Sequence, residues 1–315
     1  MGGGSTDWSR SSRYDWKDEP DVVKKSARDY AKTDRRTYSG NLSSGLPAPV
    51  GMDIHSKNPL SVVLVVDVTG SMKEWPGLIF EKIPTLYNEC NAALQKVDLD
   101  SLKAGATLDD KLEMAVIAVG DVMCDNYPLQ VVDFSSGPAL TEGINRIKPE
   151  GGGGGNLKES YDLAAYYLLK HCKIQDTGKI AKPILVIAGD EGYYLTLSPR
   201  DVKKYTGDDI SKSLDSKSLF TDLTKKYDTY LLRPELSYSS EDYAIIHKQW
   251  QDTLGPERVL KMDDPKRLVD CIIGICAYAA DNFSEGEKIL RRRQTDDQVD
   301  EVLKVLHPLL GSKKA

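Results

Sequence analysis

Two uninterrupted apolar runs constrain the fold of this chain more than any other feature of its sequence. Residues 61–66 (Ser-Val-Val-Leu-Val-Val) and 183–188 (Pro-Ile-Leu-Val-Ile-Ala) are rich in β-branched side chains and do not alternate with polar ones. A strand with one wet face alternates, so a continuous run indicates a strand that is covered on both faces. Such strands are typical of parallel sheets with helices on either side. Each run leads into a carboxylate, Asp67 after the first and Asp190 after the second.

Strand and helix patterns alternate along the rest of the middle of the chain. We expect further strands at 112–119, 130–134, 229–232 and 259–262, and helices at 78–96, 139–148, 157–172, 198–205, 214–227, 240–254 and 265–280. The first two of these further strands are joined by too few residues for a crossover helix, so they should pair antiparallel. The sequence therefore predicts an α/β fold, a Rossmann-like open and mostly parallel six-stranded sheet with helices on both faces and one antiparallel edge strand.

The composition argues against several other classes of protein. Of the 315 residues, 40% are hydrophobic and 29% charged, which is usual for a folded domain and argues against disorder throughout. No apolar stretch approaches the roughly 18 residues of a membrane span, and the first residues lack the apolar run of a secretory signal. The five cysteines are scattered and do not resemble a disulfide framework, so we expect a cytoplasmic protein. The net charge of -6 argues against nucleic acid as a partner, because nucleic-acid binders usually present a basic surface.

The chain divides into three parts by pattern. Residues 1–57 form a polar N-terminal extension, whose Gly-, Ser- and Pro-rich end at 39–51 is expected to be a linker or an extended strap on the next domain. Residues 58–283 hold the alternating strands and helices. Residues 284–315 form a C-terminal helical segment that we expect to dock on the body of the protein, with Arg291–Arg293 as a solvated helix face. Its apolar residues recur at helical spacing: Val299, Val302, Leu303, Leu306 and Leu310.

Side chains that carry oxygen gather where the two apolar strands end. Asp67 is followed by Thr69 and Ser71, and a loop leaving the strand can turn all three side chains towards one point. In an open α/β sheet, ligands bind beyond the carboxyl ends of the strands, and Asp190 belongs to the same region. Carboxylate and hydroxyl oxygens without histidine or cysteine suit a hard cation, Mg²⁺ above all. An ordinary helix cap and turn is the alternative interpretation of these residues.

The segment Asp67-Val68-Thr69-Gly70-Ser71 resembles the DxSxS motif of von Willebrand factor A (vWA) domains. In that family the motif follows the first, central strand and forms the metal-ion-dependent adhesion site (MIDAS). The expected order of elements over residues 58–283 is also similar to that of the family. The resemblance implies a vWA fold for most of the chain.

The resemblance also implies how the metal would be held. Thr69 and Ser71 would contact the cation directly, and Asp67 and Asp190 would hold it directly or through water. A further ligand would come from the later glycine-rich loop, where this chain has Asn156 in place of the usual Thr or Asp. An amide oxygen is a weaker ligand than a carboxylate and carries no charge, so Asn156 is the least secure member of the set.

The resemblance implies a function as well. A cation with few charged ligands keeps a coordination position open, and a carboxylate from a partner protein would fill it. We therefore expect a metal-ion-dependent protein–protein interaction module, an adaptor or subunit of a multiprotein complex, with Mg²⁺ as its cofactor and Ca²⁺ or Mn²⁺ as substitutes. Intracellular members of the family often work beside AAA+ ATPases, and by analogy we expect such a complex here. No catalytic residues are recognisable, so we expect no enzymatic activity.

Two other functions would use the same residues. The first is a Mg²⁺-dependent phosphoryl-transfer enzyme that employs Asp67 and Asp190. The haloacid-dehalogenase enzymes need a second Asp two residues after the nucleophile, and Thr69 occupies that place. The second is a structural subunit whose metal site is vestigial.

Five further side chains flank these motifs and have two interpretations each. Glu159 and Asp121 could support the site or could be solvated surface groups. Trp75, Tyr193 and Tyr194 could line a partner-binding rim, where aromatic residues often dominate the binding energy, or could pack within loops.

Overall fold

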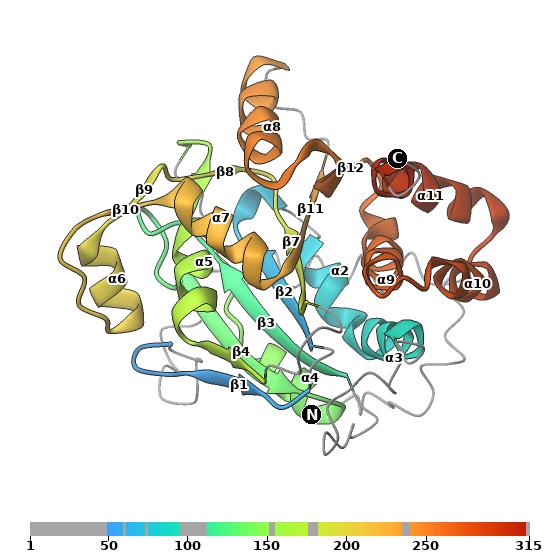
Figure 1. The fold of residues 1–315 in the computed structure, drawn as a ribbon, viewed down its shortest axis with the longest axis horizontal. Coiled ribbons are helices and arrows are strands. Elements are labelled where there is room, and N and C mark those ends of the chain that lie inside the picture. Colours follow the sequence, from blue (N-terminus) through green and yellow to red (C-terminus); the bar gives the residue numbers. More distant parts are fainter. Residues whose placement is uncertain are drawn as a thin grey trace.

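A six-stranded sheet forms the centre of the protein (Figure 1). The computed structural model describes residues 49–58, 61–72, 75–94, 112–150, 155–175, 182–234 and 240–312. The strands of the sheet are β2 (Ser61–Asp67), β3 (Glu113–Val119), β4 (Leu129–Ser135), β7 (Ile184–Ala188), β11 (Asp228–Pro234) and β12 (Val259–Met262). They lie in the order β12-β11-β7-β2-β3-β4. The edge strand β4 runs antiparallel to β3 and the other pairs are parallel, which confirms the fold class predicted from the sequence.

Helices cover both faces of the sheet (Figure 1). Those that contribute to the first apolar cluster are α2 (Trp75–Glu81), α3 (Ile83–Leu94), α4 (Pro138–Ile144), α9 (Leu268–Ala279), α10 (Phe283–Arg293) and α11 (Asp296–Ser312). Those that contribute to the second are α5 (Tyr161–Lys170), α6 (Pro199–Thr206), α7 (Ser216–Lys226) and α8 (Ser240–Leu254). None of the helices in these ranges is both long and apolar enough to cross a membrane.

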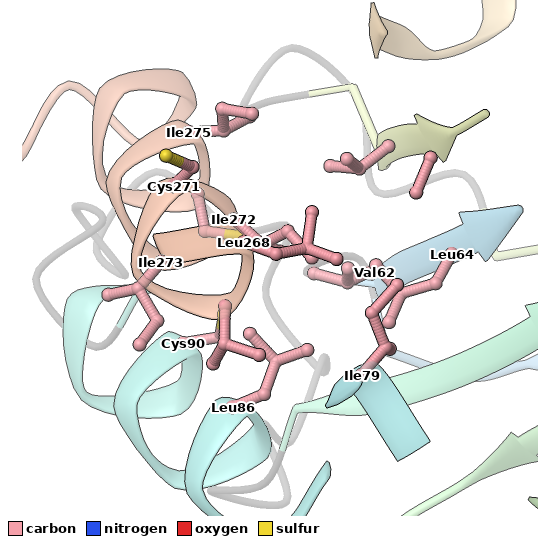
Figure 2. Close-up of a cluster of buried hydrophobic side chains, with 14 of the residues drawn as sticks. Val62, Leu64, Ile79, Leu86, Cys90, Leu268, Cys271, Ile272, Ile273 and Ile275 are labelled. Atoms are coloured by element: carbon pink, nitrogen blue, oxygen red, sulfur yellow. The ribbon is translucent and has the colours of Figure 1, made fainter. Parts of the chain in front are cut away.

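The strand that precedes the metal motif is buried on both faces. Every residue of β2 is buried, and its alternate side chains belong to opposite clusters. Val62 and Leu64 lie in the first cluster, and Figure 2 shows them facing side chains of α2, α3 and α9. Val63 and Val65 lie in the second cluster. The uninterrupted apolar run thus reflects two apolar layers that meet at β2, which lies between β3 and β7 as the vWA resemblance implies.

The helix expected at 78–96 is two helices in the structure. The first, α2, ends at Glu81, and α3 begins at Ile83. Pro84 explains the break, because proline has no N–H to donate to the carbonyl four residues earlier, and its ring would collide with that carbonyl. The helix expected at 157–172 also begins later, at Tyr161, because Lys158–Glu159 forms the short strand β5, which pairs with β8 (Gly192–Tyr193).

The described end of the N-terminal extension lies on the body of the protein. Strand β1 (Ile54–Ser56) pairs in parallel with β6 (Cys172–Ile174). Ahead of it, the backbone N–H of Gly51 donates to the carbonyl of Thr206 at 2.9 Å. The imidazole of His171 contacts Asp53 through Nδ1 and Asp208 through Nε2, each at 2.8 Å. Residues 1–48 of the extension lie outside the described residues.

The C-terminal helices α10 and α11 contribute to the first apolar cluster together with α9. In α11, Val299, Val302 and Leu306 are buried there. Gly274 of α9 allows the approach, since a Cβ at that position would lie 2.4 Å from Leu306 Cδ1. The run of three arginines is not the fully solvated face that the sequence suggested, because Arg293 is buried and pairs with Glu89 of α3.

Candidate metal centre

The motif residues lie where β2 and β7 end side by side. The two strands are parallel neighbours with Val66 opposite Ala188, so Asp67 at the end of β2 and Asp190 just beyond β7 lie at the same edge of the sheet. After Asp67, the backbone N–H of Thr69 donates to the Asp67 carboxylate at 2.9 Å and turns the chain. The short 3₁₀ turn η3 (Gly70–Met72) follows and carries Ser71. Local turn chemistry therefore gathers the three motif side chains.

A chain of hydrogen bonds joins the four residues that the strand ends supply. The Thr69 hydroxyl donates to Asp67 Oδ1 at 2.6 Å. The Thr69 and Ser71 hydroxyl oxygens lie 3.1 Å apart, and the Ser71 hydroxyl donates to Asp190 Oδ1 at 3.3 Å. The structure thus brings Asp67, Thr69, Ser71 and Asp190 together, with two hydroxyls between two carboxylates. Oxygen donors in this combination fit a hard divalent cation.

The second oxygen of Asp67 is held by a residue that the sequence did not single out. The Tyr161 hydroxyl, at the start of α5, donates to Asp67 Oδ2 at 2.6 Å. Gly189 leaves room for this contact, because a Cβ at that position would lie 1.9 Å from the Tyr161 hydroxyl oxygen. Tyr161 is fully buried and its ring meets that of Trp250 edge to face, with the centroids 5.5 Å apart. The carboxylate of Asp67 is therefore fixed through both of its oxygens.

Burial and a neighbouring carboxylate disfavour the ionised form of Asp67. Asp67 and Asp190 are both 0% exposed. Burial, and then the charge of Asp190, raise the pKa of Asp67 well above its usual value, despite the donors from Thr69 and Tyr161 that lower it. Arg233 at the end of β11 donates from Nη2 to the backbone carbonyl of Asp190 at 2.7 Å. A divalent cation between the two carboxylates would supply the charge that their ionised forms require.

Glu159 lies in the acidic interior beside the site. Its side chain is buried, with 2% of the residue exposed, and its Oε2 atom has no hydrogen-bond partner within the described part of the chain. Burial raises its pKa to about 12, and the next largest cause is the charge of Asp67. Asp121 is also fully buried. The solvated-surface interpretation of both acids is therefore wrong, and Glu159 is a second acidic group that a cation at Asp67 would influence.

Asn156 is hydrogen-bonded away from the other four predicted ligands. Its amide group donates to Asp121 Oδ2 at 3.1 Å and to the Tyr194 hydroxyl at 2.7 Å. Its carbonyl oxygen accepts from the backbone N–H of Lys158 at 2.9 Å. Tyr194 in turn donates to Asp121 Oδ1 at 2.7 Å. Asn156 thus belongs to a network centred on Asp121, and its role as a metal ligand stays a prediction. Residues 151–154 of the adjoining glycine run lie outside the described residues.

The flanking aromatic residues differ in their placement. Trp75 and Tyr193 are buried. The Tyr193 ring packs against Trp250 and Phe220, with centroid distances of 4.9 and 4.6 Å. Of the three aromatics, Tyr194 is the one that is partly exposed, and its hydroxyl serves Asp121. Trp75 and Tyr193 therefore pack into the two apolar clusters and are not part of an exposed rim.

The donor set is one of hydroxyls and few charged groups. Within the described ranges, no group of three or more His, Cys, Asp or Glu side chains is arranged to hold a metal ion. A site that combines two hydroxyls with two carboxylates has a different composition, and it suits Mg²⁺ because that ion takes oxygen ligands and keeps several waters. A metal held by such a site would keep positions open for a ligand from another molecule.

Among known proteins, the chain is similar to several solved structures. No protein-family model and no curated protein matches the chain. One similar structure is a pilus adhesin, SpaC from Lactobacillus rhamnosus GG, with 13% identity and a TM-score of 0.43 over 78% of this chain and 32% of the adhesin. Another is the manganese-loaded TRAP protein of Plasmodium vivax, with 12% identity and a TM-score of 0.35 over 74% of this chain and 75% of that protein. The chain thus spans about a third of the length of the adhesin.

These findings define the protein as an α/β protein with a candidate oxygen-donor site at the carboxyl edge of a mostly parallel sheet. The vWA resemblance rests on the motif that begins at Asp67 and on the central position of β2. Membership of that family stays a prediction.

Proposed function

We propose that the protein is a metal-ion-dependent protein-interaction module, in which Mg²⁺ at Asp67, Thr69, Ser71 and Asp190 binds an acidic side chain of a partner. The observation that carries the proposal is the hydrogen-bonded chain from Asp67 through both hydroxyls to Asp190. It joins the ends of two neighbouring strands, and both carboxylates are buried. The cation supplies a positive charge that attracts a carboxylate, and the protein supplies a fixed and weakly charged set of ligands.

The binding of metal and partner is coupled in this proposal. Two carboxylates neutralise a divalent cation only when both are ionised, and an added partner carboxylate contributes further negative charge. Metal then raises the affinity for the partner, and the partner raises the affinity for metal by the same factor. By analogy with intracellular vWA proteins, we propose that the partner belongs to a multiprotein assembly such as one built around an AAA+ ATPase.

The geometry favours binding over phosphoryl transfer. The position two residues after Asp67 carries a hydroxyl that donates to Asp67 and has no acid–base function of its own at neutral pH. We therefore propose that the protein has no enzymatic activity.

The test measures the binding of a model acidic ligand with and without the cation. Hexaglutamate is titrated into the wild-type protein by calorimetry, in Mg²⁺ and in EDTA. The matched variants are Thr69→Val, which removes one hydroxyl of the site at almost constant volume, and Thr221→Val, which removes an exposed hydroxyl that donates within α7. We expect hexaglutamate to bind in Mg²⁺ and not in EDTA, with binding lost in Thr69→Val and kept in Thr221→Val.

The alternatives predict other outcomes. Binding that is equal in Mg²⁺ and EDTA would contradict the proposal, and so would binding that survives Thr69→Val. Isolation of a cellular partner whose binding ignores both changes would favour a structural subunit with a vestigial site. Turnover of a phosphate ester that Asp67→Ala abolishes would favour the enzyme.

A further inference from the structure

One face of α8 changes from apolar to polar along the helix. Ile246 and Trp250 are buried in the second apolar cluster. Tyr243 and His247 precede Trp250 by seven and three residues, a spacing that places all three on the same side of the helix. Trp250 donates from Nε1 to the backbone carbonyl of Glu191 at 2.9 Å, next to Asp190 of the proposed metal site. Tyr243 and His247 form the more polar end of this helix face, N-terminal to Trp250.

Strands β11 and β12 also change from apolar to charged side chains towards their carboxyl ends. Leu231 of β11 and Val259 of β12 belong to the second apolar cluster and lie opposite each other in register. The next residues on the same side of the sheet are Arg233 and Lys261, which are also register partners. Like charges opposite each other on neighbouring strands repel and destabilise a sheet. Two cationic residues therefore stand side by side at the carboxyl edge of β11 and β12.

The ring of Tyr243 gathers these cationic groups. The Arg233 guanidinium carbon lies 4.4 Å from the ring centroid, and Lys261 Nζ lies 5.1 Å from it. The imidazole of His247 stacks on the same ring, with the centroids 5.9 Å apart and the planes 16° from parallel. These four residues, Arg233, Tyr243, His247 and Lys261, form what we call the Tyr243 cluster.

Lys261 and His247 differ in exposure and in charge. Lys261 is exposed and forms no ion pair in the part of the chain that the structure describes. Burial and the charges of Lys261 and Arg233 lower the pKa of His247 to about 4, so this imidazole is neutral at neutral pH. Its buried Nδ1 atom has no hydrogen-bond partner among the residues that the structure describes. The cluster thus carries net positive charge, and Lys261 carries the exposed part of it.

The Tyr243 cluster adjoins the proposed metal site through one residue. Arg233 Nη2 donates to the backbone carbonyl of Asp190, whose carboxylate accepts from Ser71. An acidic segment bound to the metal next to Asp190 would therefore meet the exposed charge of Lys261 on the side of β11 and β12, whereas Arg233 is fully buried. We propose that the Tyr243 cluster binds a second carboxylate of the same acidic partner segment. This inference rests on the proposed function and names the partner chemistry, a short stretch of chain with at least two acidic side chains.

The experiment compares two lysine variants at opposite edges of the sheet. Lys261→Gln removes the accessible charge of the cluster, and Lys182→Gln removes an exposed charge just before the start of β7. Hexaglutamate is titrated into each full-length variant at saturating Mg²⁺, and Mg²⁺ alone is titrated in parallel. We expect Lys261→Gln to lower the affinity for hexaglutamate about three- to ten-fold, because the variant loses one exposed ion pair with the ligand. Lys182→Gln should match the wild type, and both variants should bind Mg²⁺ alone as the wild type does.

The outcomes separate this inference from the proposed function. Equal affinity of wild type and Lys261→Gln for hexaglutamate in Mg²⁺ would overturn the role of the cluster and leave the metal module intact. Binding that EDTA does not reduce, but that Lys261→Gln still weakens, would overturn the metal module instead. A wild-type protein that does not bind hexaglutamate in Mg²⁺ would overturn both. A charge-reversing variant, Lys261→Glu, should weaken binding further than Lys261→Gln, and an equal or smaller loss would also count against the inference.

Discussion

The carboxylate of Asp67 shows how much of the site depends on single hydrogen bonds. One oxygen accepts from the backbone and hydroxyl of Thr69, and the other accepts from Tyr161. Without these donors, the carboxylate could rotate and its protonated form would be favoured further, and either change would weaken its hold on a cation. Groups that orient a metal ligand commonly change metal affinity by an order of magnitude or more although they do not touch the metal.

Removal of the Tyr161 hydroxyl should therefore weaken the metal site without unfolding the protein. Tyr161→Phe keeps the ring that packs against Trp250 and deletes only the donor to Asp67. We expect the affinity for Mg²⁺, measured by calorimetry, to fall about ten-fold. The control is Tyr167→Phe on the same helix, which deletes a hydroxyl that donates to the carbonyl of Met52 and should leave Mg²⁺ binding unchanged. Equal effects of the two variants would mean that the Tyr161 hydroxyl does not orient Asp67.

At the scale of elements, sequence predicts what depends on local pattern and misses what depends on pairing. The apolar runs at β2 and β7 predict buried strands, because short continuous apolar runs have few other interpretations. Short strands such as β5 and β8 contain two residues each, and no periodicity can be seen over that length. The break between α2 and α3 had a signal in Pro84, which lies within the apolar pattern that suggested one helix. The run of three arginines looked solvated because composition does not show which member meets an acid.

Arg293 and its neighbour Arg292 allow a direct comparison of a buried and an exposed arginine. Arg293 of α10 is buried and donates from Nε to Glu89 Oε1 of α3 at 2.9 Å, whereas Arg292 is exposed. Arg293→Ala would leave the buried Glu89 without this partner, and we expect the free energy of unfolding to fall by about 3 to 5 kcal/mol. Arg292→Ala should change it by about 0.5 kcal/mol or less. Urea denaturation of both variants measures the difference, and similar losses would show that the buried pair does not fasten α10 to α3.

At the scale of the whole molecule, the parallel sheet turns distant residues into one site. Ser71 and Asp190 are 119 residues apart in sequence, and they meet because β2 and β7 are neighbours that end at the same edge. That edge could be predicted from the two apolar runs, and with it the grouping of Asp67, Thr69, Ser71 and Asp190. The hydrogen bonds of Asn156 to the Asp121 network could not, and neither could the role of Tyr161. Both depend on the path of the chain between Gly155 and α5, where no periodic pattern constrains it.

The same arrangement sets a conflict between stability and metal binding that a single substitution can expose. In the absence of a cation, the fold must bury Asp67 close to Asp190, and both the burial and the neighbouring charge disfavour the ionised carboxylate. Asp67→Asn keeps the shape of the side chain and removes that charge. At mildly alkaline pH in EDTA, we expect the variant to unfold with a free energy about 1 to 3 kcal/mol higher than the wild type.

Mg²⁺ should reverse this order. A ligand that binds only the folded state stabilises it by about 2.7 kcal/mol at a hundred times its dissociation constant, so the wild type should gain stability in excess Mg²⁺. Asp67→Asn lacks a charged ligand and should gain little. Urea unfolding of both proteins in EDTA and in Mg²⁺ measures all four free energies. A wild type whose stability ignores Mg²⁺, or a variant that gains as much as the wild type, would show that the two buried carboxylates are not there to hold a cation.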